Sequence, residues 1–252
     1  MGILVGDTGF VGSHLARLHN FDHRVHRSDI MSISELNTDL LVCAGLPAEK
    51  WRANQDPTTD WANMAVLAQV LSTVQAENAV LISTIDVYQP AVGVDETTPA
   101  NFDGSGTYGA HRAWFESFFR AHFPDALILR LPALFASDVR KNLVHDLLHG
   151  KADQWAGVNP ASTFQWFDVT QVWATVQFAW SEGIRLLNVT SEPVSAESVA
   201  NLFGVRLSAQ SAPVTYDMRS IHAAVLGGKD GYLYTGQAVL EGISALRGES
   251  PS

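Results

Sequence analysis

The chain has 252 residues, of which 46% are hydrophobic and 17% are charged, and this composition suits a globular protein with one large core. Its formal net charge of −10 argues against a broad nucleic-acid-binding surface, so an anionic ligand would be met locally, by loop amides and a few arginines. The single cysteine, Cys43, excludes an intramolecular disulfide and a cysteine-based zinc cluster.

A glycine-rich turn near the N-terminus predicts a nucleotide-binding site. The apolar run 2–5 predicts a strand, the run 13–18 predicts a helix, and glycines stand at positions 6, 9 and 12. Gly6 allows a tight turn, Gly9 lets the backbone approach a pyrophosphate, and Gly12 lets the helix pack closely on the strand. The spacing is Gly-x-x-Gly-x-x-Gly rather than the standard Gly-x-Gly-x-x-Gly. We therefore expect a dinucleotide to contact Gly6, Gly9, Phe10, Val11 and Gly12.

The second predicted strand, 23–28, leaves the identity of the dinucleotide open. If the strand ends at Arg27 and Ser28, a cation and a hydroxyl would meet the 2′-phosphate of NADP. If it ends one residue later, Asp29 could accept hydrogen bonds from the ribose of NAD. NADP is the preferred alternative. A third interpretation, in which these charges only solvate the end of a strand, also stays open.

The next predicted strand, 39–44, ends in small residues. Ala44 and Gly45 would let a cofactor lie across the carboxyl end of this strand. The polar stretch 50–60 predicts a loop, and the apolar spacing that follows predicts a helix over 59–75.

Two further stretches carry the groups that a reaction needs. The buried-strand pattern 79–82 runs into Ser83 and Thr84, and Asp86 follows two residues later, so an extended chain would point Thr84 and Asp86 the same way. In the second stretch Tyr108 and Arg112 are four residues apart and share one face of a helix. A hydroxyl, a phenol and a positive charge could together assist hydride and proton transfer at a carbinol carbon.

Aromatic residues at 114–123 give the Tyr108 helix a stripe that is wide for a single interface. One side of it could cover the sheet and the other a partner subunit, although deep burial in a monomer explains it nearly as well. A strand at 126–131 follows, ending before Pro132.

The order of these elements predicts an α/β fold with a Rossmann-type doubly wound parallel sheet. The strand–helix alternation loosens beyond residue 140. We therefore predict a dinucleotide-binding Rossmann core over 1–140 and a small substrate-binding portion over 141–252, interleaved with the last sheet elements.

His145 and His149 have the spacing of a zinc-protease helix, but Asp146 stands where the general base would be Glu, so two ordinary helix histidines are the better explanation.

Over residues 3–205 the chain resembles the extended branch of the short-chain dehydrogenase/reductase superfamily, which contains the NAD-dependent nucleotide-sugar epimerases and dehydratases. Each motif alone is weak, and the resemblance rests on five of them in the expected order. They are Ile3 to Leu15, Ile82 to Tyr88, Asp95-Glu96 with Pro99, Arg130-Leu131-Pro132, and Glu192-Pro193-Val194-Ser195.

The resemblance implies roles for individual residues. Tyr108 would be the acid/base that acts on a substrate hydroxyl, Thr84 would hydrogen-bond the same oxygen, and Pro132 would end the strand that touches nicotinamide. Arg112 stands where the family has a lysine that holds the nicotinamide ribose and lowers the pKa of the tyrosine. An arginine can supply both effects, with a different geometry because its fork is larger.

The departures from the family pattern bear on the substrate. Asp86 is the single acid after Thr84, which makes dehydration less expected than epimerisation or reduction. The chain has Phe164-Gln165 where the family often has an Arg-Asp pair that meets a nucleotide diphosphate, so Arg140 or Arg219 could take over. Asn142 is a further candidate for a substrate contact.

The expected function is that of an NAD(P)-dependent epimerase or reductase that acts on a sugar, which we expect to be nucleotide-linked. The resemblance also implies a homodimer that pairs through the helices that start near Thr59 and Tyr108. The alternative is an inactive NAD(P)-binding redox sensor or scaffold protein. No basic leader precedes the first apolar run and no run reaches the roughly 18 residues of a membrane span, so we expect a cytoplasmic protein with no membrane or nucleic-acid partner.

Overall fold

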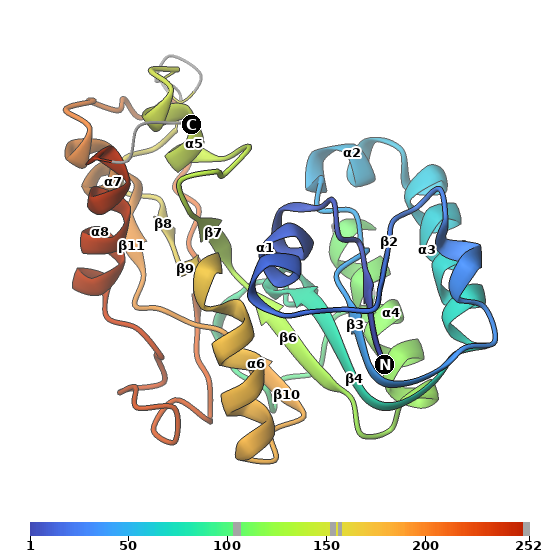
Figure 1. The fold of residues 1–252 in the computed structure, drawn as a ribbon. Coiled ribbons are helices and arrows are strands. Elements are labelled where there is room, and N and C mark those ends of the chain that lie inside the picture. The colour runs from blue at the N-terminus through green and yellow to red at the C-terminus, as the bar shows by residue number, and fades with distance from the viewer. Residues whose placement is uncertain (103–106, 152–154, 156–157, 249–252) are drawn as a thin grey trace. The chain divides into compact units, whose positions relative to one another are not determined.

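The computed structural model describes residues 1–102, 107–151, 155 and 158–248, which divide into two compact units (Figure 1). Unit 1 comprises Met1–Pro90, Thr98–Arg130 and Val172–Leu187. Unit 2 comprises Ala91–Thr97, Leu131–Gln171 and Asn188–Ser252. Each unit draws on three segments of the chain, so no single cut, such as the predicted boundary at residue 140, separates them.

Unit 1 is built on a sheet with the strand order β10-β6-β4-β3-β1-β2. The bounds of its strands are Gly2–Val5 (β1), His23–Val25 (β2), Asn37–Cys43 (β3), Gln75–Thr84 (β4), Leu127–Leu131 (β6) and Leu186–Asn188 (β10). β1 pairs in parallel with both β2 and β3, and β3 pairs in parallel with β4. Because β2 and β3 lie on opposite sides of β1, the winding direction of the chain reverses there. The predicted Rossmann-type doubly wound α/β fold is confirmed.

Helices cover this sheet in two groups (Figure 1). Their bounds are Phe10–Leu18 (α1), Lys50–Gln55 (α2), Pro57–Leu71 (α3), Thr107–His122 (α4) and Val172–Ser181 (α6). α1 packs on α6, whereas α2, α3 and α4 pack on one another. Among the residues that the structure describes, none of the helices combines the length and the apolar character that a membrane crossing requires.

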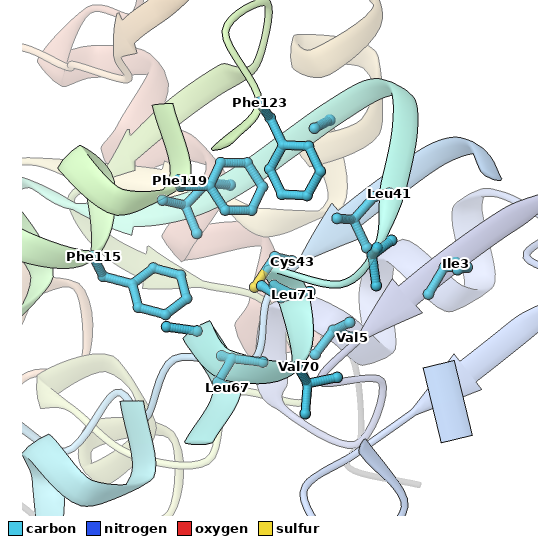
Figure 2. Close-up of a cluster of buried hydrophobic side chains, with 14 of the residues drawn as sticks. Ile3, Val5, Leu41, Cys43, Leu67, Val70, Leu71, Phe115, Phe119 and Phe123 are labelled. Carbon is cyan, nitrogen blue, oxygen red and sulfur yellow. The ribbon is translucent and has the colours of Figure 1, made fainter. Parts of the chain in front are cut away.

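The aromatic stripe of α4 divides between a core and its margin. Figure 2 shows Phe115, Phe119 and Phe123 in the cluster that α3 and α4 form with the strands, and each of the three is at least 95% buried. Full burial of such a side chain contributes about 1.5–3 kcal/mol. Trp114 and Phe118 are partly buried and pack against the edge of the same cluster. The width of the stripe therefore reflects one face toward the core and one toward the surface.

The stretch 50–60 was predicted to be a loop, and this prediction is wrong. It forms α2 and the first turn of α3. Six residues of helix are too few to show an apolar period, which explains why α2 was missed. The start of α3 did have a signal: Asp56 accepts a hydrogen bond from the Thr59 amide at 3.1 Å, and Pro57 takes the first helical position.

Unit 2 consists of short strands and helices. Their bounds are Val92–Val94 (β5), Ala133–Phe135 (β7), Leu143–Leu148 (α5), Thr163–Phe164 (β8), Trp166–Asp168 (β9), Val194–Ser195 (β11), Ala196–Leu202 (α7), Asp217–Met218 (β12) and Gly236–Ala245 (α8). The strands form the pairs β11-β8, β12-β5 and β7-β9.

The rings of His145 and His149 stack, with 4.3 Å between their centroids. Asp146 accepts a hydrogen bond from the Trp155 indole at 2.6 Å.

Candidate active site

The glycine turn lies between β1 and α1, at the point where the winding of the sheet reverses. Gly6 has φ +87°, the left-handed region that favours glycine, so the predicted tight turn is confirmed. A Cβ on Gly12 would lie 1.9 Å from the Gly6 carbonyl oxygen, so α1 approaches the turn itself. A Cβ on Gly9 would meet one atom within 4 Å, the Gly6 oxygen at 3.2 Å. The backbone at Gly9 thus has room beside it for a ligand's phosphate.

The amides at the start of α1 point to the same kind of ligand. Gly9 is the N-cap residue and offers no side chain to cap the helix. The first amides of a helix have no acceptor within it, and they attract anions. Phe10, Val11 and Gly12 supply these amides, so the residues expected to meet a pyrophosphate lie together in one turn.

The carboxyl end of β2 carries a compact polar cluster. β2 ends at Val25, earlier than either alternative predicted. Asp29 accepts a hydrogen bond from the His26 amide at 2.7 Å, and the Ser28 hydroxyl lies 3.0 Å from Nε2 of His26. The carboxylate of Asp29 is therefore engaged in closing the turn, while Arg27 is exposed.

Ala44 and Gly45 follow β3 directly and lie against the glycine turn. The Ala44 amide donates to the Val5 carbonyl at 2.8 Å, and a Cβ on Gly6 would lie 2.7 Å from Cα of Gly45. Larger side chains would crowd this junction. Because β1, β3 and β4 are parallel, their carboxyl ends meet at one edge of the sheet, and this edge holds the glycine turn, Gly45 and Thr84.

Thr84 is the last residue of β4. Its Oγ1 accepts a hydrogen bond from the Asp86 amide at 3.2 Å and caps a short 3-10 helix, Ile85–Val87. The strand geometry therefore stops before Asp86, and the expectation that Thr84 and Asp86 point the same way on an extended chain is wrong. The carboxylate of Asp86 instead accepts a hydrogen bond from Nζ of Lys50 at 2.7 Å.

Gly109 brings the tyrosine helix to the end of β4. A Cβ on this residue would lie 2.0 Å from the backbone carbonyl oxygen of Asp86. The first turn of α4 therefore packs on the 3-10 helix that follows Thr84. The amide of Tyr108 is held by Asn54 Oδ1 at 3.0 Å. The absence of a side chain at 109 was the available signal, but the sequence alone gave it no role.

Arg112 is buried, with 1% of its surface exposed. Its guanidinium hydrogen-bonds both carboxylate oxygens of Asp60, one of them at 2.9 Å, and donates to the Pro47 carbonyl. It also stacks on the Tyr108 ring, 3.9 Å from the ring centroid. These partners hold the two terminal nitrogens of Arg112 within unit 1, whereas its buried Nε has no hydrogen-bond partner among the described residues. A contact of Arg112 with a nicotinamide ribose remains a prediction from the sequence.

Tyr108 is 7% exposed, and burial raises the pKa of its phenol. Arg112 acts in the opposite direction, as does Lys50, whereas the carboxylates of Asp86 and Asp60 add to the rise. The cation of Arg112 does not outweigh the burial, since Asp60 neutralises it at close range. Tyr108 is therefore protonated at neutral pH.

Lys50 is a charged residue at this site that no sequence motif predicted. It does not follow a tyrosine by four positions, so no motif marked it. α2 brings it to Asp86, and its side chain remains 42% exposed. The edge of the sheet around Thr84 and Tyr108 thus includes a second cation besides Arg112.

Gln165 stands where the family often has an Arg-Asp pair, and Asn142 and Arg219 were expected near a substrate. All three have partners within unit 2. Gln165 is 1% exposed, and its amide bonds the backbone of Ser191 and Met218. Asn142 caps α5, accepting from the His145 amide at 3.2 Å and donating to the Leu134 carbonyl at 2.7 Å. Arg219 donates to the Asp230 carbonyl at 2.8 Å and is 46% exposed.

Arg140 is exposed, and Pro132 directly follows β6. Both residues belong to unit 2. Their roles toward a substrate or a cofactor remain predictions from the sequence.

The fold and this edge together define a Rossmann-type α/β protein with a glycine turn at the reversal of its sheet. Models of known protein families give no match to the chain, and no curated protein sequence matches it. Solved structures do match, 427 chains in all.

One of them is dTDP-4-dehydrorhamnose reductase from Yersinia enterocolitica, with a TM-score of 0.73 and 12% identity over 98% of this chain and 99% of that one. Another is RMD from Pseudomonas aeruginosa complexed with NADPH, with a TM-score of 0.69 and 15% sequence identity. This match covers 98% of this chain and 97% of that one. A third is the UDP-glucose 4-epimerase of Thermus thermophilus complexed with NAD, with a TM-score of 0.68 and 17% sequence identity. This match covers 99% of this chain and 100% of that one. At these identities the likeness establishes a shared fold over the full length of the chain.

Proposed function

We propose that the protein is an NAD(P)-dependent oxidoreductase that acts on a nucleotide-linked sugar. The observation that carries the proposal is the meeting of three features at one edge of the sheet: the glycine turn, Thr84 at the end of β4, and Tyr108 at the start of α4. The glycine turn suits a pyrophosphate, and the hydroxyl and the phenol suit a reacting carbon–oxygen group. The structural neighbours add support, since they include a reductase and an epimerase of such sugars.

The dinucleotide would be held by the amides of Phe10, Val11 and Gly12 and would lie across Ala44 and Gly45. We propose NADP rather than NAD. Asp29 is engaged with the His26 amide, whereas Arg27 is exposed and can meet a 2′-phosphate. NAD remains the second candidate, because Asp29 has another carboxylate oxygen that could accept from a ribose.

When bound, the nicotinamide supplies or accepts hydride. The chain's own residues handle the proton and the orientation. Tyr108 donates its phenolic proton to the substrate oxygen as the carbon–oxygen group is reduced, and the Thr84 hydroxyl hydrogen-bonds the same oxygen. Because burial raises the pKa of Tyr108, the phenol is in the donor form at neutral pH, and we propose reduction of a keto sugar as the working direction.

The alternative, a cofactor-binding protein without turnover, draws on one specific observation. Arg112, at the position where the family has lysine, is buried and neutralised by Asp60. A redox sensor or scaffold would need the glycine turn and could dispense with a charged group beside Tyr108.

The test is calorimetric titration of the purified protein with NADPH and NADH, followed by a screen of keto forms of dTDP- and UDP-linked sugars for NADPH oxidation. We expect NADPH to bind more tightly than NADH, and Arg27→Ala to remove that preference. Tyr108→Phe should lower kcat by about 10²–10⁴-fold, the typical contribution of a general acid, with dinucleotide affinity unchanged.

The outcomes separate the proposals. Dinucleotide binding without turnover of any keto sugar would favour the sensor or scaffold. Binding of neither dinucleotide would remove the oxidoreductase proposal. A preference for NADH that Arg27→Ala leaves unchanged would move the ribose contact to Asp29. Parallel loss of turnover and dinucleotide affinity in Tyr108→Phe would identify Tyr108 as a structural residue.

We further propose that the protein is a homodimer that pairs through α3 and α4. Trp61 and Val66 of α3 are 40% and 50% exposed, and Trp61 packs on Trp114 of α4 with 4.5 Å between ring centroids. The Trp114 ring stacks on Phe118 at 6.1 Å. Aromatic side chains that line up along two neighbouring helices suit a second apolar surface, and a second copy of the chain offers one.

A further inference from the structure

Positive charge near Tyr108 comes from two residues that differ in access. Arg112 lies under the phenol ring, bonded to Asp60 and to the Pro47 carbonyl, and is 1% exposed. Lys50 lies on α2 with its side chain 42% exposed. Of the two cations, Lys50 is the one that solvent and a bound substrate can reach.

Lys50 is connected to Thr84 and Tyr108 through Asp86 and through α2. Its Nζ lies 2.7 Å from Oδ1 of Asp86, whose own side chain is 18% exposed. Asp86 lies in the 3-10 helix that Thr84 caps, and its backbone carbonyl is the group on which Gly109 packs. The same α2 holds the start of the tyrosine helix, through Asn54 and the Tyr108 amide. Lys50, Thr84 and Tyr108 are thus tied to one junction.

We propose that Lys50, paired with Asp86, is the positioning residue that provides the solvent-accessible positive charge for the Thr84–Tyr108 site, which Arg112 does not provide. This inference rests on the proposed function, because it takes Tyr108 as the proton donor. Lys50 acts through Tyr108: its ammonium stabilises the charge that remains on the phenolic oxygen once the proton has passed to the substrate.

The charged groups around the phenol set the expected signs. Arg112 on α4 and Lys50 on α2 lower the pKa of Tyr108, whereas Asp86 in the 3-10 helix and Asp60 on α3 raise it, and His111 of α4 contacts Asp60. Lys50→Met should therefore raise the pKa of Tyr108. Asp86→Asn should lower it, because it removes a negative charge that raises the pKa of the phenol. In the double variant both charges are gone, and the pKa should return close to that of the unmodified protein.

The experiment is an NMR titration of the protein labelled at the tyrosine phenol carbon, with the Tyr108 signal assigned by its loss in Tyr108→Phe. Lys50→Arg keeps the charge and should retain the original titration. Lys229→Met is the matched control, since Lys229 is 89% exposed and lies 3.9 Å from Asp230 in unit 2. It should leave the Tyr108 titration unchanged.

Turnover gives a second readout. Lys50→Met should lower kcat for the reduction about tenfold, the factor that corresponds to one pKa unit of acid strength, while KM for NADPH stays constant. An unchanged Tyr108 titration in Lys50→Met, or a Lys50→Arg variant that behaves like Lys50→Met, would overturn the inference. The titration needs no substrate. A protein in which Lys50 controls Tyr108 but no dinucleotide binds would contradict the proposed function and leave the electrostatic assignment standing.

Discussion

Gly109 shows how one missing side chain can position a reactive group. Its Cα lies so close to the Asp86 carbonyl that any Cβ would overlap the oxygen, at 2.0 Å. The atom in the way is backbone, so it cannot rotate aside as a flexible side chain could. The first turn of α4 would have to move away from the end of β4 and carry Tyr108 with it.

We expect Gly109→Ala to impair turnover more than stability. Alanine gains about 0.5–1 kcal/mol of helix preference over glycine, which offsets part of the cost of the overlap. A misplacement of about 1 Å at a reacting group can cost about 10²-fold in rate, so kcat should fall by that order. Gly248→Ala is the control, because a Cβ there has no neighbour within 4 Å. Full activity in Gly109→Ala would show that the close approach does not position Tyr108.

At the scale of elements, α3 and α4 are joined by a buried charge cluster. Asp60 of α3 is 6% exposed and hydrogen-bonds the guanidinium of Arg112 and, at 2.7 Å, Nδ1 of His111, both on α4. Burial alone would raise the pKa of Asp60, but the hydrogen bonds and charges of Arg112 and His111 outweigh it and lower the pKa below the usual 3.8. The cluster therefore stabilises the ionised carboxylate.

Asp60→Asn should lower the free energy of unfolding by about 3–5 kcal/mol, since it leaves Arg112 buried without its counter-charge. The pKa of Asp60 is lower in the folded state, so this contribution is present above the usual aspartate pKa and is lost as the pH falls through the folded value. Urea unfolding of both proteins at several pH values should show the difference shrinking at acidic pH. Asp125→Asn is the control: Asp125 and Arg185 are 75% and 59% exposed, and such a pair is worth about 0–1 kcal/mol. A pH-independent difference would contradict this account.

How far the sequence could predict each element depended on the kind of signal it carried. The strands β1, β3, β4 and β6 and the helix α4 were predictable because each has a long apolar pattern or a spaced motif. The spacing of the glycines after β1 likewise predicted the tight turn there. α2 had six residues and no such pattern. The burial of Arg112 and the pairing of Lys50 with Asp86 were out of reach, because both depend on partners 52 and 36 positions away. Spacing within a helix indicated that Tyr108 and Arg112 share a face and gave no information about Asp60.

At the scale of the whole molecule, the exposed aromatic face of α3 and α4 makes the oligomeric state testable. Trp61→Glu combined with Val66→Glu should convert a dimer to a monomer, because two charges would enter an apolar interface without partners. Analytical ultracentrifugation over a range of concentrations measures this. Phe178→Glu is the control, since Phe178 on α6 is 42% exposed and lies outside that face. A native protein that is monomeric at all concentrations, or a dimer that persists in the double variant, would contradict the proposed interface.

The alternation of the chain between its two units affects the order in which the protein can fold during synthesis. Strand β10, at one edge of the sheet of unit 1, ends at Asn188, and the 41 residues of Leu131–Gln171 that come before α6 belong to unit 2. While the ribosome translates that stretch, β6 is the exposed edge of an incomplete sheet, with backbone groups that another chain could pair with. The sheet is complete only after β10 has left the ribosome. Until then this edge stays open to aggregation. We therefore expect shortened chains that end before residue 186 to accumulate as insoluble protein, even though they contain the glycine turn, Thr84 and Tyr108.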